Sequence, residues 1–213
     1  MDIIKIADNL YLFSSFEGSI NLSFNQFLLL GSDSVLIHTG NQQQATELAP
    51  KLPQILGERN LSYIFISHFE SDECGGLKTI IESFPKAKPV CSAVTARQLK
   101  GFGLASEVIV KAPAENLETA DYKLSFIGYP SEMHLWEGLM TLETKNALLF
   151  SSDIFIRRGK VTEPVINVNW PEEVQGITPE QIPSAPGLAM LQKTLTDLPV
   201  KLVAPGHGPC LRT

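Results

Sequence analysis

The chain has 213 residues, of which 44% are apolar and 19% charged, and its formal net charge is −6. This length suits one large domain better than two, so we expect residues 1–213 to form a single domain with a well-buried core. The chain contains no run of five or more basic residues, and its negative charge argues against binding to nucleic acid through the phosphates.

The apolar stretches and the cysteines indicate the expected compartment. Apolar runs such as residues 27–30 and 63–66 are too short to cross a bilayer. The first residues lack the basic and long apolar regions of a signal peptide. The chain has three cysteines, Cys74, Cys91 and Cys210, which form no CxxC pair and do not give the even number that a disulfide framework needs. We therefore expect reduced cysteines in a cytoplasmic protein without a membrane partner.

In chain order, the first half predicts strands joined by tight turns, then a helix, a buried strand and a second helix. The Gly/Ser/Asp turn at residues 31–34 lies between two β-rich runs and predicts a hairpin. Residues 45–56 have helical spacing, which Pro50 and Pro53 are expected to break or shorten. The apolar positions of the second helix, residues 75–84, share one face. The strands expected here cover residues 3–8, 10–15, 24–30, 34–40 and 61–68.

The second half predicts shorter strands and one long helix. Residues 138–143 and 147–153 form a hairpin that turns on residues 145–146. Residues 160–186 contain five prolines and little periodicity, so we expect an irregular connection that packs over a functional site. Residues 187–198 predict an amphipathic helix. The remaining strands cover residues 88–92, 106–110, 123–129 and 201–209. Strand groups separated by helices in two similar halves predict an α/β fold with two sheets between helices.

Potential metal ligands are concentrated where the buried strand of residues 61–68 ends. His68, Glu70 and Asp72 occupy alternate positions, and two glycines follow that allow close backbone approach at the helix start. Three more potential ligands adjoin strand-like runs: His134, Asp153 and His207. Loops at one edge of a sheet sandwich can bring several strand ends to one site. The six side chains could therefore give two or three ligands to each of two metals.

The order and spacing of these motifs resemble those of the metallo-β-lactamase superfamily, whose signature is a histidine-rich loop before a helix and then a His, an Asp and a last His. The resemblance covers nearly the whole chain and implies a metallo-β-lactamase-like αββα sandwich of two mixed sheets between helices. Most hydrolases of that superfamily have His-x-His-x-Asp-His in the first motif, whereas this chain reads His68-x-Glu70-x-Asp72-Glu73. A glutamate at the second position is similar to the flavodiiron and oxygen-binding di-iron branch.

The resemblance implies a centre of two iron ions. Each iron has its own ligands and one carboxylate bridges the pair: His68, Glu70 and His134 for the first, Asp72 and His207 for the second, and Asp153 for the bridge. The implied function is to bind or reduce O2 or NO. Because the chain ends soon after the last histidine, we expect no FMN domain in it, and the electrons would come from a separate flavoprotein or rubredoxin-like donor. The resemblance also implies a homodimer, and a protein without an efficient donor could act as an oxygen sensor.

Charge favours redox iron over hydrolytic zinc. Two divalent ions bring +4, while Glu70, Asp72 and Asp153 return −3, or −4 if Glu73 also binds. A nearly neutral centre stabilises the higher oxidation states of redox chemistry, and it weakens the Lewis acidity that a hydrolase needs. Two alternatives stay open: a zinc or manganese hydrolase of an ester, thioester or phosphodiester, and a degenerate, non-catalytic binding domain.

Two positions depart from the superfamily pattern. Glu73 stands where a histidine is usual; it either binds metal or is an acid favoured by the helix dipole in the first turn. His38 stands where an aspartate usually supports the site; it either hydrogen-bonds a ligand carboxylate or is a partly buried histidine without a role. Three aromatic residues adjoin the ligands and would wall an apolar gas pocket or pack in the core: Phe69, Trp136 and Phe155.

Overall fold

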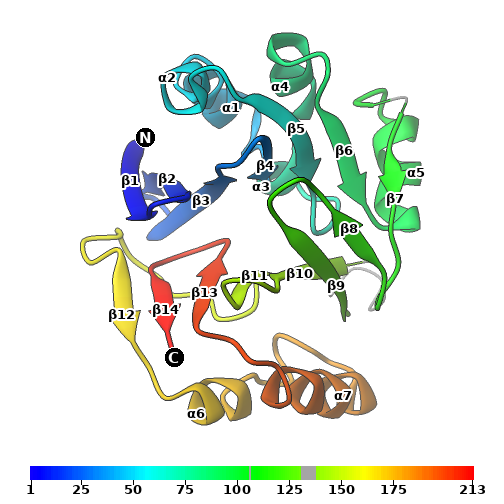
Figure 1. Cartoon of the computed structure of the whole chain (residues 1–213). Coiled ribbons are helices and arrows are strands. Elements are labelled where there is room, and N and C mark those ends of the chain that lie inside the picture. The colour runs from blue at the N-terminus through cyan, green and yellow to red at the C-terminus, as the bar shows by residue number, and fades with distance from the viewer. Residues whose placement is uncertain (106, 131–137) are drawn as a thin grey trace.

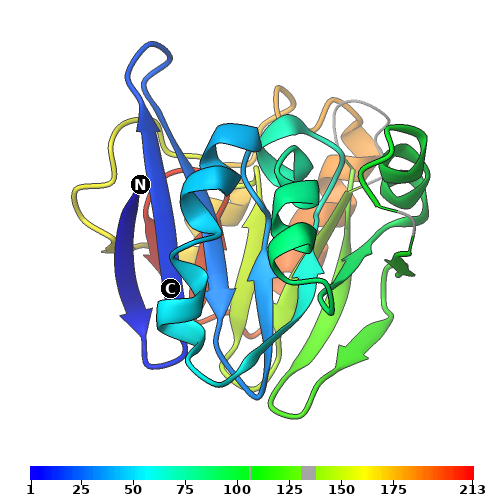
Figure 2. The ribbon, with the colours of Figure 1, turned by 90° about the horizontal axis from the view of Figure 1, so that it is seen from above.

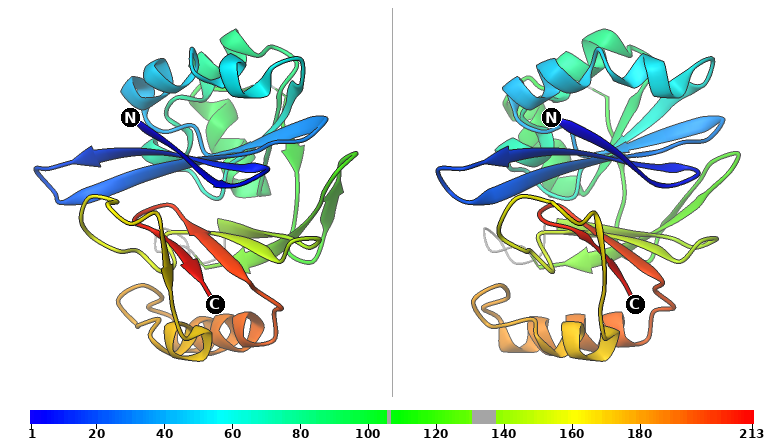
Figure 3. Two further views of the ribbon diagram at one scale, coloured as in Figure 1. Left: turned by 60° about the vertical axis from the view of Figure 1, so that its left-hand side comes forward. Right: turned by 90° about the vertical axis from the view of Figure 1, so that its left-hand side faces the viewer.

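The computed structural model describes residues 1–105, 107–130 and 138–213, and it contains two seven-stranded sheets packed face to face (Figure 1). Helices cover the outer face of each sheet, which the views in Figure 3 show from the side. Both sheets mix parallel and antiparallel pairs. This arrangement confirms the predicted α/β sandwich of two mixed sheets between helices.

The first sheet contains the N-terminal strands. Its first three strand pairs are antiparallel and its last three are parallel, in the order β1-β2-β3-β4-β5-β6-β7. The hairpin expected around residues 31–34 joins the third and fourth strands. The strand bounds are β1 (Asp2–Ala7), β2 (Leu10–Glu17), β3 (Leu22–Leu29), β4 (Asp33–Ile37), β5 (Asn60–Phe65), β6 (Lys88–Cys91) and β7 (Ile109–Val110).

The second sheet contains the later strands in the order β12-β14-β13-β11-β10-β9-β8. The predicted hairpin of residues 138–153 forms its centre, because β10 pairs antiparallel with β11. The strand bounds are β8 (Asn116–Glu118), β9 (Lys123–Tyr129), β10 (Gly138–Glu143), β11 (Leu148–Ser152), β12 (Val165–Asn167), β13 (Leu202–Pro205) and β14 (Cys210–Arg212).

The helices divide between the two outer faces. Four of them cover the first sheet, as Figure 2 shows from above: α1 (Gln42–Leu48), α2 (Leu52–Leu56), α4 (Leu77–Ser83) and α5 (Ala93–Gly101). The second sheet carries α6 (Trp170–Gln175) and α7 (Ala185–Thr196), and the short α3 (Ser71–Cys74) lies between β5 and α4 in the chain. The expected break at Pro50 separates α1 from α2. No helix in the described ranges is long and apolar enough to cross a membrane.

Apolar side chains form three layers, one between the sheets and one under each set of helices. Phe27 of β3 contacts Phe150 of β11 with ring centroids 5.9 Å apart, and Phe65 contacts Phe126 at 5.6 Å. Because both faces of each sheet are covered, the central strands read as continuous apolar runs rather than alternating ones. All three cysteines are buried and unpaired.

Residues 160–186 are more regular than the proline content predicts. Pro164 directly precedes β12, Pro171 is the second residue of α6, and Pro186 is the second residue of α7. Proline is tolerated at the two helix positions because the first turn of a helix leaves its N–H groups unpaired. These three of the five prolines thus mark where elements begin. The segment builds the edge and outer face of the second sheet, and only Gln181 reaches the ligand cavity described below.

Gly76 allows α4 to approach α1 closely. A Cβ at this position would lie 2.1 Å from the Cβ of Ala45, and the Gly76 N–H donates to the carbonyl of Gly40 at 2.8 Å. We expect Gly76→Ala to lower the free energy of unfolding by about 1–3 kcal/mol through overpacking, as measured by urea denaturation. Gly101→Ala is the control, since a Cβ there meets no atom within 4 Å. Equal stability of the two variants would contradict the close approach.

Candidate metal centre

Several loops at one edge of the sandwich bring the potential ligands together. His68 follows β5, Asp153 directly follows β11, and His207 is the second residue after β13. Residues 70–73 supply three carboxylates from the cap and first residues of α3. The strands fix these loops from two different sheets, so side chains far apart in sequence converge on one place.

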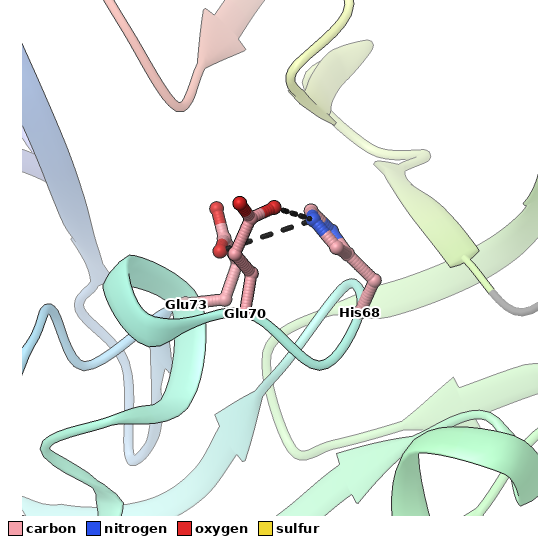
Figure 4. Close-up of side chains that lie close together, drawn as sticks. All are labelled: His68, Glu70 and Glu73. Atoms are coloured by element: carbon pink, nitrogen blue, oxygen red, sulfur yellow. Dashed lines mark hydrogen bonds and ion pairs between the residues drawn. The ribbon is translucent and has the colours of Figure 1, made fainter. Parts of the chain in front are cut away.

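His68 is surrounded by carboxylate oxygens. Its Nε2 lies 2.9 Å from Glu70 Oε2, 3.3 Å from Asp153 Oδ2 and 3.9 Å from Glu73 Oε2. Figure 4 shows Glu70 and Glu73 pointing from the α3 turn toward the imidazole. Both His68 and Glu73 are buried, while the Glu70 side chain is 54% exposed. The imidazole therefore faces a group of oxygens at the distances expected of ligands that share one metal.

His207 has the same surroundings on the other side of Asp153. Its Nδ1–H donates to the carbonyl oxygen of Ser23 at 2.9 Å, which leaves Nε2 as the nitrogen with a lone pair free for a metal. This Nε2 lies 3.4 Å from Asp72 Oδ2 and 3.4 Å from Asp153 Oδ1. Asp153 thus turns one oxygen toward each histidine, which is the geometry of a bridging carboxylate.

A hydrogen-bonded group of side chains holds His68 from behind. Its Nδ1 lies 3.0 Å from Ser67 Oγ and 3.3 Å from Ser152 Oγ, and the two hydroxyls are 2.8 Å apart. His38 Nε2 contacts Ser67 Oγ at 2.9 Å, and burial together with nearby His68 lowers the pKa of His38 to about 3. His38 is therefore neutral, and its Nε2 contacts a serine rather than a candidate ligand carboxylate, which was one of the two alternatives for this residue.

Backbone strain occurs at the same edge. His38, Ser152 and Phe155 have φ angles of 63°, 53° and 71°. Such left-handed conformations are unfavourable for residues with a Cβ, and they persist where the surrounding structure enforces them, often at functional sites. Two of these residues support His68, and the third follows Asp153 by two positions.

The charges of the site influence one another strongly. Burial lowers the pKa of His68, but its hydrogen bond to Glu70 and the charge of Asp153 outweigh burial and raise that pKa overall. The same balance, with Asp153 as the main partner, raises the pKa of His207. Burial and the charge of Asp153 raise the pKa of Glu73 well above its usual range. These carboxylates therefore gain from a cation among them.

Unpaired oxygens and the kinds of donor both fit metal ions. Glu73 Oε2 and Asp153 Oδ1 are buried without a hydrogen-bond partner, which is costly for a carboxylate. Imidazole and carboxylate ligands suit divalent first-row metals. Two sets of side chains have ligand atoms within 4.8 Å of one another: His68, Glu70 and Glu73, and Asp72, Glu73 and His207. The described residues thus fit two neighbouring metal positions.

A cavity of about 480 Å³ opens onto the ligands. Among the described residues its walls are partly apolar: Ile20, Leu22, Phe24, Tyr129, Ile154 and Ile156. Phe24 packs edge-on against His207 with ring centroids 5.1 Å apart, and Tyr129 does the same against His68 at 5.9 Å. A larger cavity of about 710 Å³ adjoins α4 and α5 and includes none of the candidate ligands.

Of the two alternatives for the aromatic residues beside the candidate ligands, apolar packing describes Phe69 and Phe155. Phe69 packs against Phe102 with ring centroids 5.0 Å apart, and Phe155 packs against Trp170 at 5.2 Å. Each side chain turns toward neighbouring apolar residues rather than toward the candidate ligands beside it in sequence. The other predictions, His134 as a ligand and Trp136 as a wall, lie outside the described residues.

Residues 22–208 match the family model described as ODP family beta lactamase. This match covers most of the chain. The chain belongs to the ODP family of β-lactamase-like domains. Membership agrees with the resemblance to the metallo-β-lactamase superfamily inferred from the ligand motifs.

Relatives of this ODP domain include larger redox proteins. The chain is 27% identical over 203 residues to a protein of Thermosynechococcus vestitus described as a diflavin flavoprotein, covering 89% of this chain and 34% of the relative. It is 29% identical over 137 residues to the anaerobic nitric oxide reductase flavorubredoxin of Salmonella typhi, covering 62% and 28%. The chain thus spans about a third of the length of the curated relatives it matches.

Solved structures share the fold. The rubredoxin oxygen:oxidoreductase of Desulfovibrio gigas superposes with a TM-score of 0.80 at 18% identity, covering 99% of this chain and 57% of that one. Flavodiiron cores give similar scores. The metallo-β-lactamase-like fold expected from the sequence is confirmed.

Sequence reasoning missed the polar residues that hold the ligands of this ODP domain in position. Asn25 Nδ2 donates to the carbonyl oxygens of Pro205 at 3.1 Å and Gly208 at 2.7 Å, so β3 holds the loop that carries His207. Ser67 and Ser152 support His68. The available signal was a polar residue in or beside a buried strand, since a buried polar group usually needs a specific partner.

Proposed function

We propose that this chain is a non-haem di-iron protein that binds or reduces O2 or NO with electrons from a separate donor. The observation that carries the proposal is Asp153, which turns one oxygen toward His68 Nε2 at 3.3 Å and the other toward His207 Nε2 at 3.4 Å. The first iron would be held by His68 and Glu70, with His134 as the sequence suggests. The second would be held by Asp72 and His207, with Asp153 between the two.

The balance of ligands favours iron with redox chemistry. Four carboxylates surround the candidate positions: Glu70, Asp72, Glu73 and Asp153. If all four are ionised, their charge of −4 balances the +4 of two divalent ions. A balanced centre favours the higher oxidation states of iron and disfavours the Lewis acidity used by zinc hydrolases. Two similar proteins, a nitric oxide reductase and an oxygen oxidoreductase by name, support O2 or NO as the ligand.

The protein would orient the ligands and admit a small gas. When bound, a di-iron centre would supply the binding positions for O2 or NO and pass on the electrons of the separate donor. The Ser23 carbonyl holds His207 in the tautomer with a free Nε2, while Ser67 and Ser152 orient His68. The partly apolar cavity walls suit a small, weakly polar molecule. A rubredoxin-like or flavin-containing donor is supported by the names of the relatives, flavorubredoxin and rubredoxin oxygen:oxidoreductase.

Gas consumption tests this function. Anaerobic protein is loaded with ferrous iron, supplied with a chemically reduced flavoprotein or rubredoxin, and followed with O2 and NO electrodes. We expect consumption of at least one gas that depends on both iron and donor. Zinc- or manganese-loaded protein serves in a parallel assay with chromogenic esters, thioesters and phosphodiesters. Hydrolysis without any reductant, combined with no gas binding by the iron form, would replace the proposal by a metallohydrolase.

The affinity for metal is expected to fall as the pH is lowered. The pKa values of His68 and His207 are raised above 6.5 in the metal-free chain, so each imidazole keeps its proton to higher pH than usual. Metal binding must displace these protons, so affinity is full above the raised pKa values and is lost below them, by up to about two decades per pH unit. Calorimetric titration with Mn²⁺ in buffers of different ionisation enthalpy measures the protons released. Metal binding that releases no protons at a pH below these raised pKa values would contradict the prediction.

A further inference from the structure

We infer that Glu73 is a carboxylate ligand shared by both metal positions, so that two carboxylates, Glu73 and Asp153, join the metals. The inference rests on the proposed metal centre and deepens it. In this arrangement, each of the two metals depends on the Glu73 side chain.

The Glu73 side chain is buried and directed into the site. It is 1% exposed, its Oε2 lies 3.9 Å from His68 Nε2, and this oxygen has no hydrogen-bond partner (Figure 4). The backbone is held in place, because the Glu73 carbonyl accepts from the Thr39 N–H at 2.9 Å and from Thr39 Oγ1 at 3.2 Å. The side chain thus extends from a fixed point toward the ligands.

Glu73 is the one residue common to both ligand sets in the described part of the chain. Its carboxylate groups with His68 and Glu70 on one side and with Asp72 and His207 on the other, with ligand atoms within 4.8 Å in each set. A carboxylate has two oxygens, so it can give one to each of two neighbouring metals. A side chain that served only one metal would not be expected to lie within reach of both sets.

The helix dipole does not account for this position. The helix α3 has only four residues, so its dipole is small. No lysine or arginine forms an ion pair with Glu73 in the described ranges, and its one ion-pair partner there is His68. A buried carboxylate with an unpaired oxygen needs a compensating charge, and two cations would supply it.

The shared ligand has a consequence for metal choice. Where the superfamily pattern has a neutral imidazole, this chain has an anionic oxygen ligand. Added carboxylates make a site harder, so the centre should favour Fe²⁺ and Mn²⁺ over Zn²⁺ more strongly than a histidine at position 73 would allow. The departure from the pattern thus changes the selectivity of the site rather than disabling it.

The test compares metal binding by four proteins: the unaltered chain, Glu73→Gln, Glu73→His and the control Glu82→Gln, whose side chain is exposed on α4. Each is titrated anaerobically with Fe²⁺ alone and, separately, with Zn²⁺ alone, and the iron forms are examined by Mössbauer spectroscopy for magnetic coupling. Circular dichroism is used to check that each variant is folded.

We expect Glu73→Gln to weaken both iron sites at least tenfold and to change the coupling between the irons. Glu73→His should keep two metals but shift the Zn²⁺/Fe²⁺ affinity ratio at least tenfold toward zinc, and Glu82→Gln should match the unaltered chain. If Glu73→Gln weakened iron binding at one site only, Glu73 would be a ligand of a single metal and the shared role would be overturned. Unaltered iron binding at both sites in Glu73→Gln would also overturn it. No iron binding by the unaltered chain would refute the proposed metal centre itself.

Discussion

Replacing Asp153 by asparagine is expected to remove nearly all iron binding and, with it, the reduction of O2 or NO. Each oxygen of Asp153 faces a different histidine, at 3.3 Å from His68 Nε2 and 3.4 Å from His207 Nε2. The amide has the same shape but no charge, and it offers one oxygen instead of two. The iron affinity of both sites should therefore fall by about 100-fold or more. Losing a residue that only supports a ligand typically lowers metal affinity by about 10- to 100-fold, so the loss of a direct ligand should reach or exceed that range.

The control for Asp153→Asn is Asp8→Asn, which removes an equal charge from an exposed position. Iron content after desalting and the rate of gas consumption are measured for both. The control should keep the iron content and rate of the unaltered chain. If Asp153→Asn also kept them, the carboxylate would not bridge the metals and the proposed ligand arrangement would be wrong.

Replacing Asn25 by alanine is expected to damage both stability and the second metal site. The Asn25 side chain donates to two backbone carbonyls in the loop around His207 and accepts from Ser14 Oγ at 2.9 Å. Its loss leaves buried carbonyls unpaired, so we expect the free energy of unfolding to fall by about 2–4 kcal/mol. Because the same loop carries His207, affinity for the second metal should fall as well.

Urea denaturation of the metal-free protein and iron titration measure the two effects of Asn25→Ala separately. Asn116→Ala, at an exposed position of β8, provides the matched control. The control should change stability by less than about 0.5 kcal/mol. A stable Asn25→Ala protein with unaltered iron affinity would show that this side chain does not hold the His207 loop.

The fold and the ligand loops could be predicted from the sequence because their signals are local or ordered along the chain. Continuous apolar runs identified the central strands, such as β5 and the β10–β11 hairpin. Potential ligands placed directly after strands identified the loops that converge at one edge. His68, Asp153 and His207 come together because the two sheets face each other. The order of the motifs along the chain predicted this arrangement through the resemblance to the superfamily.

The supporting contacts could not be predicted because they depend on which residues meet across the fold. His38 contacts Ser67, and only the parallel pairing of β4 with β5 brings these two residues together. Phe69 and Phe155 adjoin ligands in sequence, yet each turns toward apolar neighbours instead of the cavity. Three of the five prolines of residues 160–186 lie where elements begin, and proline content alone does not separate that role from an irregular loop.

Metal analysis of anaerobically purified protein, with absorption spectra recorded before and after admission of air, would decide whether this chain holds a redox di-iron centre. We expect about two irons per chain, as in other two-metal sites, and a ligand-to-iron absorption band that grows on oxygenation. Stoichiometric zinc with no spectral change, or no metal after reconstitution, would contradict the proposed function.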